Sequence, residues 1–170
     1  MNKIFLTIIV GIITSILVKY LLYYIQKFWY YWPKIKIEFE AGTTKAHSND
    51  MVHRTFMWSG NMILYNITKH DALNIVLEWP TGKPPFQLDK LNDKHLKGLT
   101  TQKLKYNVGC RFLISDIANA DVETFYPIEC KEFKIVLCYE NEMGKSFYTL
   151  FKKDVTGEFC TFHKKKPKVN

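Results

Sequence analysis

The residues Ile4–Ile25 read IFLTIIVGIITSILVKYLLYYI, an apolar run of 22 residues with a single charged residue, Lys19, and no proline. A helix rises about 1.5 Å per residue, so this run covers ~33 Å, enough to cross a hydrocarbon core of about 30 Å. Only three residues precede it. We therefore expect a membrane anchor at residues 1–32, one domain at residues 33–163 and a basic tail at residues 164–170.

A cleaved signal peptide is the main alternative to a retained membrane span. Signal peptides end in small residues at the cleavage site. Here the run continues through Lys19-Tyr20-Leu21-Leu22-Tyr23-Tyr24, which is bulky and aromatic throughout. A buried helix of a soluble protein is a third interpretation, but an apolar run of this length at a chain start is typical of a span. The sequence favours the retained span.

Aromatic residues are concentrated at the end of the run, between Tyr20 and Trp32. Such rings bury their apolar body at a membrane interface and keep their polar tip in water, and a lysine side chain can extend toward the same interface. Pro33 then ends the helix. We predict an interfacial belt made of Lys19, Tyr23, Tyr24, Trp29 and Trp32.

The lysines around the span predict its orientation. Lys3 precedes the span, whereas Lys19, Lys27, Lys34 and Lys36 all come before the first acidic residue that follows it, Glu38. Positive residues favour the cytoplasmic side of a membrane. We therefore expect a single-pass protein of the cell inner membrane, with its carboxyl-terminal domain in the cytoplasm.

The remainder of the chain has the period-two pattern of β-strands. In Lys34–Glu40 the apolar residues Ile35, Ile37 and Phe39 alternate with charged ones, which predicts a half-buried strand. Similar patterns predict strands at Arg54–Asn66, Leu73–Trp79, Leu104–Val108, Cys110–Ile114, Glu132–Tyr139, Ser146–Phe151 and Glu158–His163. Seven or eight short strands separated by turns indicate a mainly β domain, an antiparallel sandwich or a small barrel.

Other segments of this domain lack a strand pattern. We expect a polar loop at Ala41–Val52, a bulge or bend at Ser59–Asn61, a short helix within Gln87–Gly98 and a linker at Asp116–Thr124. The apolar faces of the alternating strands predict which residues form the core. We expect the following side chains to be buried on facing sheets: Trp58, Leu77, Trp79, Ile135 and Leu137.

Two pieces of the domain carry a family resemblance. Their sequences resemble the strand and hairpin sequences of bacterial immunoglobulin-like domains. The first piece is the run Gly60–Asn66 followed by Asp71–Leu77, and the second is the pattern L-x-Y-x-N-x-x-G-x-x-x-Y-T from Leu137 to Thr149. In architecture, an anchor followed by a small β domain is similar to Cap15-like effectors of anti-phage defence. Those proteins join two membrane helices to a β-barrel that senses a cyclic nucleotide. The resemblance implies a nucleotide ligand and spans that assemble to disrupt the membrane.

The sequence offers little catalytic chemistry. The five histidines are never spaced as metal ligands, and there is no G-x-S-x-G, P-loop or G-x-G-x-x-G motif. Cys110, Cys130, Cys138 and Cys160 lack a C-x-x-C pair and resemble no small secreted framework, so we interpret them as apolar core residues. We expect no enzyme activity, no cofactor and no metal site. A Cys/His pair that only the fold brings together stays an alternative. Asn66-Ile67-Thr68 fits a glycosylation sequon, which matters only in a secretory compartment.

The chain is basic, with 24 Lys and Arg residues against 16 Asp and Glu residues and a net charge of +8. Its tail is either a solvated terminus or a contact with anionic lipid, which attracts a nearby base by about 1 kcal/mol. The predicted lipid contacts are Lys164, Lys165, Lys166 and Lys168. Nucleic-acid binding requires a basic face with stacking aromatic residues. The aromatic residues here belong to the belt and to core-facing positions, which argues against nucleic acid.

Small and hydroxyl residues lie along one side of the predicted span. Helices in lipid associate by close packing at such residues, although these residues are also common in spans that stay monomeric. The predicted packing stripe consists of Thr7, Gly11, Thr14, Ser15 and Val18. The sequence therefore favours an anchored interaction module that holds a partner protein at the inner membrane face. The alternative is an anti-phage effector whose β domain senses a cyclic nucleotide and whose spans self-associate, and an unrecognised enzyme is a third hypothesis.

Overall fold

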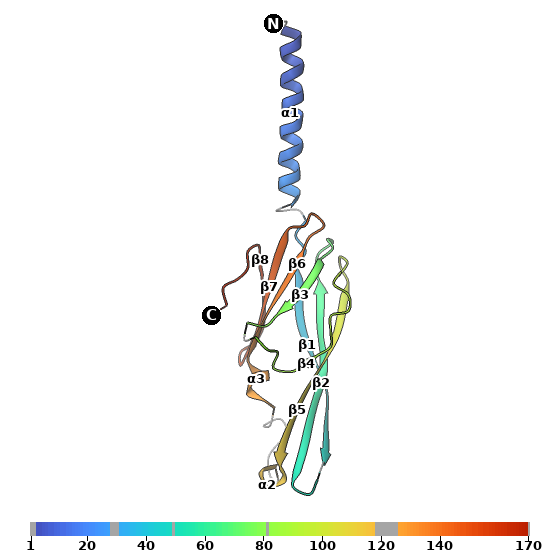
Figure 1. The fold of residues 1–170 in the computed structure, drawn as a ribbon, viewed down its shortest axis with the longest axis vertical. Coiled ribbons are helices and arrows are strands. Elements are labelled where there is room, and N and C mark those ends of the chain that lie inside the picture. The colour runs from blue at the N-terminus through green and yellow to red at the C-terminus, as the bar shows by residue number, and fades with distance from the viewer. Residues whose placement is uncertain (1–2, 28–30, 49, 81, 118–125, 170) are drawn as a thin grey trace.

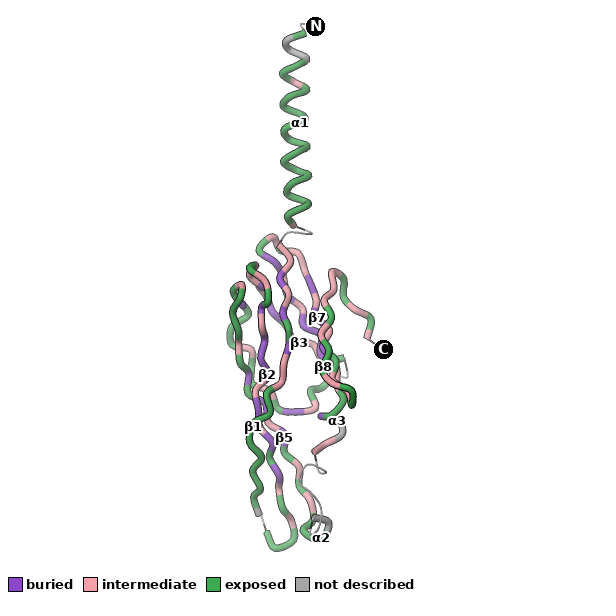
Figure 2. Tube along the Cα trace, turned by 180° about the vertical axis from the view of Figure 1, so that it is seen from behind, coloured by how far each residue is buried: buried purple, intermediate pink, exposed green. Residues whose placement is uncertain are grey.

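The computed structural model describes residues 3–27, 31–48, 50–80, 82–117 and 126–169. Helix α1 (Lys3–Ile25) stands at one end of a β domain (Figure 1). Residues 10–26 are all exposed, so none of the apolar surface of this stretch is covered by the domain (Figure 2). By length and composition, α1 is able to cross a membrane.

The described residues of the β domain form eight strands in two antiparallel sheets. The first sheet has the order β1-β2-β5-β4 and the second the order β3-β6-β7-β8. These two layers confirm the prediction of a mainly β antiparallel sandwich. The strands are β1 (Ile35–Ser48), β2 (His53–Asn66), β3 (Leu73–Glu78), β4 (Gln87–Leu88), β5 (Thr101–Leu113), β6 (Phe133–Glu140), β7 (Ser146–Asp154) and β8 (Gly157–His163). Two short helices, α2 (Ile114–Ile117) and α3 (Ile128–Lys131), lie between β5 and β6.

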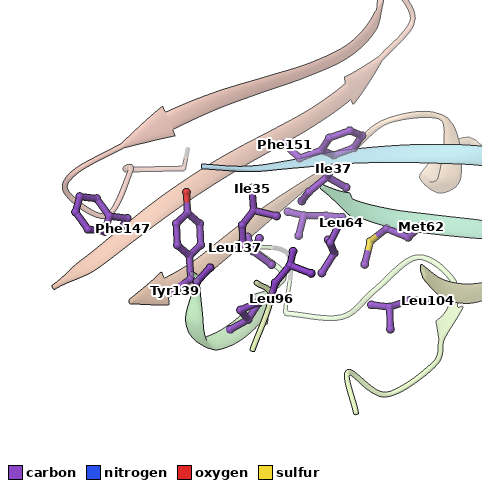
Figure 3. Close-up of a cluster of buried hydrophobic side chains, with 13 residues drawn as sticks. Ile35, Ile37, Met62, Leu64, Leu96, Leu104, Leu137, Tyr139, Phe147 and Phe151 are labelled. Carbon is purple, nitrogen blue, oxygen red and sulfur yellow. The ribbon is translucent and has the colours of Figure 1, made fainter. Parts of the chain in front are cut away.

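The core fills the space between the two sheets. Ile37, Met62 and Leu64 of the first sheet face Leu137 and Phe151 of the second (Figure 3). A second cluster farther from α1 consists of Phe56, Trp58, Phe86, Tyr106, Val108 and Cys130. Burial of Trp58, Ile135 and Leu137 is confirmed. Leu77 and Trp79 are only half-buried, because β3 is the edge strand of its sheet.

Contacts at both lateral edges join the two sheets. On one side the Cys160 Sγ lies 3.4 Å from both the backbone nitrogen and the carbonyl oxygen of Ile37, and Thr149 Oγ1 donates to the Ile35 carbonyl at 2.7 Å. On the other side Ala72 and Leu96 exchange two backbone hydrogen bonds of 2.9 Å. The sandwich is therefore closed part of the way toward a barrel.

The loop predicted at Ala41–Val52 is wrong for its first eight residues. Residues 41–48 continue β1 and pair with β2 as far as Ser48↔Arg54, so backbone hydrogen bonds stabilise a strand that has no apolar face. The bulge or bend expected at Ser59–Asn61 of β2 lies instead in the partner strand β1, between Ala41 and Thr44. A side chain at Gly42 would approach the Ser59 carbonyl oxygen to 2.2 Å, which explains why glycine occupies this position.

The helix predicted within Gln87–Gly98 is also wrong. Gln87–Leu88 forms β4, and Leu96 is buried where it pairs with Ala72, so pairing with other strands overrides the helical spacing of the leucines. The two strands predicted at Leu104–Val108 and Cys110–Ile114 are one continuous strand, β5. Of the predicted linker, residues 116–117 belong to α2, and the other residues lie outside the described part of the chain.

Strands β1, β2 and β5 extend beyond the second sheet and form an arm that points away from α1 (Figure 1). The strand β1 begins ten residues after the end of α1 and contains 14 residues. At ~3.3 Å per residue the far end of the arm therefore lies about 45 Å from the start of β1. The residues of its outer half are mostly exposed on β1 (Figure 2).

Candidate functional site

The predicted packing stripe lies on α1 and is fully exposed. Thr7, Gly11, Thr14, Ser15 and Val18 have no cover from the β domain. The hydroxyls of Thr7, Thr14 and Ser15 donate to the carbonyls four residues earlier, at 3.0, 2.8 and 2.9 Å. These hydroxyls are therefore satisfied within their own helix. Self-association through the stripe stays a prediction.

The predicted belt is divided between the helix and the β domain. Lys19, Tyr23 and Tyr24 are exposed on α1, and the Tyr24 ring contacts that of Tyr20 at 5.3 Å. Trp29 lies outside the described residues. Trp32 stacks on Phe147 of β7 at 5.7 Å and packs against the main core, with the ammonium groups of Lys34 and Lys164 each 4.9 Å from its ring.

Asn141 connects the end of α1 to the β domain. Its side chain is fully buried, and its Nδ2 donates to the carbonyls of Lys27 at 3.1 Å and Tyr31 at 2.7 Å. Its Oδ1 accepts from the backbone nitrogens of Met143 at 3.1 Å and Lys145 at 2.8 Å. Carbonyls at a helix end need partners from outside the helix. Asn141 therefore holds the chain that leaves α1 against the β6–β7 loop, a role that the sequence analysis missed.

Asn66 organises the neighbouring loops in the same way. Its Nδ2 donates to the carbonyls of His70 at 2.7 Å and Leu96 at 3.1 Å, and its Oδ1 accepts from the Thr68 hydroxyl at 2.9 Å. The side chain is 2% exposed. Because the amide nitrogen is buried and bonded, Asn66 in this fold offers no acceptor for glycosylation.

The basic tail folds back on the second sheet. Lys164 contacts Trp32, and Lys166 Nζ lies 2.7 Å from Glu78 Oε2 on β3. The hydrogen bond from Lys166 lowers the pKa of Glu78. Lys165 and Lys168 are exposed. Of the four predicted lipid contacts, Lys166 is thus directed to the protein, and Lys164 lies next to the helix exit.

A cavity lies beside the arm, away from α1. It is an open cleft of about 1170 Å³. Its floor contains Trp79, Phe86 and Val108, and Met57 of β2 lines it with a side chain that is 41% exposed. The charged residues at its rim are Lys83, Asp89, Arg111 and Glu129. The lining is therefore mainly apolar, with charges of both signs.

The titratable groups of this cleft and its margin are described by their contacts. No described residue of its lining is a histidine, and burial raises the pKa of the Cys110 thiol, which keeps it protonated. Arg111 Nη2 is held by Asp50 Oδ2 at 2.8 Å. Two backbone nitrogens, those of Val52 and His53, donate to Asp50 and are the main causes that lower its pKa to about 2. The described part of the chain also contains no cluster of His, Cys, Asp or Glu that would hold a metal ion.

The chain matches no protein-family model, no curated protein and no solved structure. The resemblances to immunoglobulin-like domains and to Cap15-like effectors therefore stay predictions.

Proposed function

We propose that this protein is a single-pass membrane anchor for a binding module, which holds a segment of a partner protein in the cleft beside the arm. The observation that carries the proposal is the placement of helix α1 and of the cleft at different positions on the β domain. An apolar, uncovered helix lies at one end of the β domain (Figure 1). The open apolar cleft is lined by residues of β4 and of the part of β5 farther from α1. Asn141 ties the helix end to the same domain that forms the cleft.

The size of the cleft favours a polypeptide over a small molecule. Pockets for small ligands usually measure about 300–1,000 Å³ and enclose most of the ligand. This cleft is larger and open, and of its two described basic residues Arg111 is paired with Asp50. A nucleotide needs several groups that converge on its phosphates. The lining therefore suits an apolar peptide with charges of both signs.

The backbone of β5 gives such a peptide a further means of binding. On this side of β5, β4 pairs only with Asn107 and Tyr106, after which Pro84 and Pro85 prevent further pairing. The described pairs of β4 with β5 end at Asn107, although β5 continues to Leu113. An extended segment laid along residues 109–111 would add a strand there.

Photo-crosslinking of the full-length chain in its own membrane tests the cleft. A photoreactive side chain at Met57 should crosslink a partner protein, whereas the same group at Val76, which is exposed on β3, should not. A side chain at Gly109 meets no atom within 4 Å, so Gly109→Trp should fill the cleft and abolish the crosslink, and Gly109→Ala should keep it. Crosslinking that is unchanged by Gly109→Trp would exclude the cleft as the binding site.

The lysine pattern supports a cytoplasmic location for the module. A reporter that is active only in the cytoplasm should be active when it is fused to the carboxyl terminus of the chain. Activity of a periplasmic reporter at the same position would reverse the proposed orientation.

A further inference from the structure

Three loops of the β domain surround the exit of α1, and we call them together the proximal face: residues 67–71, 96–100 and 141–145. The first is bonded to the chain that leaves the helix, since the Ile67 nitrogen donates to the Lys34 carbonyl at 2.9 Å. The second is held by the first, because the Leu99 nitrogen donates to the Thr68 carbonyl at 2.7 Å. The third holds the helix end through Asn141. The proximal face is thus fixed in position relative to α1.

Lysines outnumber acidic residues on this face. Lys69, Lys97 and Lys145 belong to the three loops, and Lys27 and Lys34 belong to the connection from α1. The acidic residues are Asp71 and Glu142. Asp71 accepts hydrogen bonds from the Gly98 nitrogen and from His95, and these bonds lower the pKa of its carboxyl group. The net charge of the face is therefore positive.

Two large apolar side chains are exposed among these lysines. Ile67 is 48% exposed and Leu99 is 66% exposed. Leu99 has a φ of 57°, a left-handed conformation that a leucine adopts only at an energetic cost. Glycine or asparagine would be the ordinary residue at such a position. The fold therefore keeps an apolar side chain exposed at a place where a small polar residue would be more stable.

We propose that the proximal face binds the headgroup layer of an anionic bilayer, with the lysines on lipid phosphates and Ile67 and Leu99 inserted between the lipids. The inference rests on the proposed function in one respect, because α1 must span the membrane. Given that span, Lys27 follows the end of α1 by two residues and the bonded loops lie beside the membrane surface. Basic residues near an anionic leaflet and apolar side chains at an interface are both stabilised there.

Lipid is the expected ligand of the proximal face, because the proposed anchor α1 brings this face to the bilayer. Any protein partner would have to enter between the loops and the bilayer to which the chain is attached. The positive charge complements phosphate headgroups, and the isolated apolar side chains are too few to form the core of a protein interface. Binding should therefore depend on the charge of the lipid.

Hydrogen–deuterium exchange of the full-length chain in lipid nanodiscs tests the inference. Amides in residues 67–71 and 96–100 should exchange several-fold more slowly in phosphatidylglycerol discs than in phosphatidylcholine discs. Residues 50–53, at the far end of the arm, should exchange equally in both. Equal exchange of the proximal loops in the two lipids would overturn the inference.

Two sets of substitutions sharpen this test. Replacing Lys69, Lys97 and Lys145 by Gln should abolish the lipid-dependent difference, with a weakening of the contact by up to roughly 100-fold. Replacing Lys45, Lys105 and Lys131 by Gln removes the same charge elsewhere and should leave the difference intact. Equal effects of the two triple substitutions would show that net charge alone is responsible and would overturn the assignment to this face.

A single substitution at Leu99 separates lipid insertion from a structural role. Leu99→Gly relieves the left-handed strain, so the unfolding temperature in detergent should rise while protection in anionic discs falls. A lower unfolding temperature with unchanged protection would make Leu99 a packing residue and contradict insertion. Alkaline extraction distinguishes the two proposals: release of the wild-type chain from membranes would contradict the anchor, whereas a retained chain without lipid-dependent protection contradicts only this inference.

Discussion

Replacing Asn141 by Ala should detach the end of α1 from the β domain and destabilise the fold. The side chain makes four hydrogen bonds, two to the carbonyls of Lys27 and Tyr31 and two from the nitrogens of Met143 and Lys145, and it is fully buried. Each such bond contributes about 0.5–1.5 kcal/mol net, so we expect a loss of roughly 2–6 kcal/mol in the free energy of unfolding. That is a large part of the 5–15 kcal/mol typical of a domain.

The assay is denaturant unfolding of the full-length chain in detergent micelles, followed by near-ultraviolet circular dichroism. Asn61→Ala is the matched control, because the Asn61 side chain makes one long contact of 3.5 Å with Glu40 at the surface, and we expect a change below ~0.5 kcal/mol. A change for Asn141→Ala as small as that of the control would refute the assigned role of this residue.

Asn141→Asp separates the hydrogen bonds that the side chain donates from those that it accepts. The introduced carboxylate keeps the acceptor for Met143 and Lys145 but faces the carbonyls of Lys27 and Tyr31 without a proton to donate. Burial and these carbonyls should raise the pKa of the introduced group in the folded state. Its stability should therefore be highest at low pH and fall as pH rises through that pKa, whereas the alanine variant should lack this dependence.

Three further predictions concern the core, the arm and the span. Leu137→Ala should cost roughly 2–5 kcal/mol because Leu137 is fully buried, and Leu77→Ala should cost less because its side chain is half-buried; equal unfolding midpoints would mean that the strand register is wrong. In the folded protein the pKa of Asp50 is about 2, below the ordinary value of 3.8. The contribution of this carboxylate to the stability of the β1–β2 turn is therefore present above pH ~4 and is lost as pH falls toward 2. A carbon-detected NMR titration should follow that carboxyl group, and a midpoint near 3.8 would contradict the hydrogen bonds to Val52 and His53. An unrelated single span in place of residues 4–25 should leave partner binding at the cleft intact, and a loss of function despite normal membrane insertion would favour the effector hypothesis.

The sequence predicted those parts of the fold whose physics is local. The apolar helix α1 is visible in the sequence because a candidate span must be apolar along one continuous segment. The strand around Ile35, Ile37 and Phe39 is visible because one face of it contacts the core. Residues 43–48 have no such face, since the outer part of the arm is exposed and its strand is held by backbone pairing with β2.

The parts that could not be predicted depend on contacts between distant segments. Leu88, Leu91 and His95 have spacings that suit a helix, yet the next residue, Leu96, pairs with Ala72, 24 residues earlier. Asn141 reads as an ordinary turn residue before glycine, and its partners at Lys27 and Tyr31 are more than 100 residues away. The cleft likewise combines β2, β5, the segment around Pro84 and the region of α3. No local pattern indicates that these segments meet.

In the proposed membrane-anchored arrangement, the continuous pairing of β1 with β2 and β5 also sets the distance of the cleft from the membrane. Val108 of the cleft is in register with Trp58, which pairs with Thr44 of β1, nine residues after Ile35. At ~3.3 Å per residue the cleft stands about 30 Å from the start of β1. A partner anchored in the same bilayer must present its binding segment at that height, whereas a segment close to its own membrane exit would pass beneath the cleft. The length of the strand therefore restricts binding to membrane proteins whose binding segment lies at a matching distance from the bilayer, whatever side chains that segment carries.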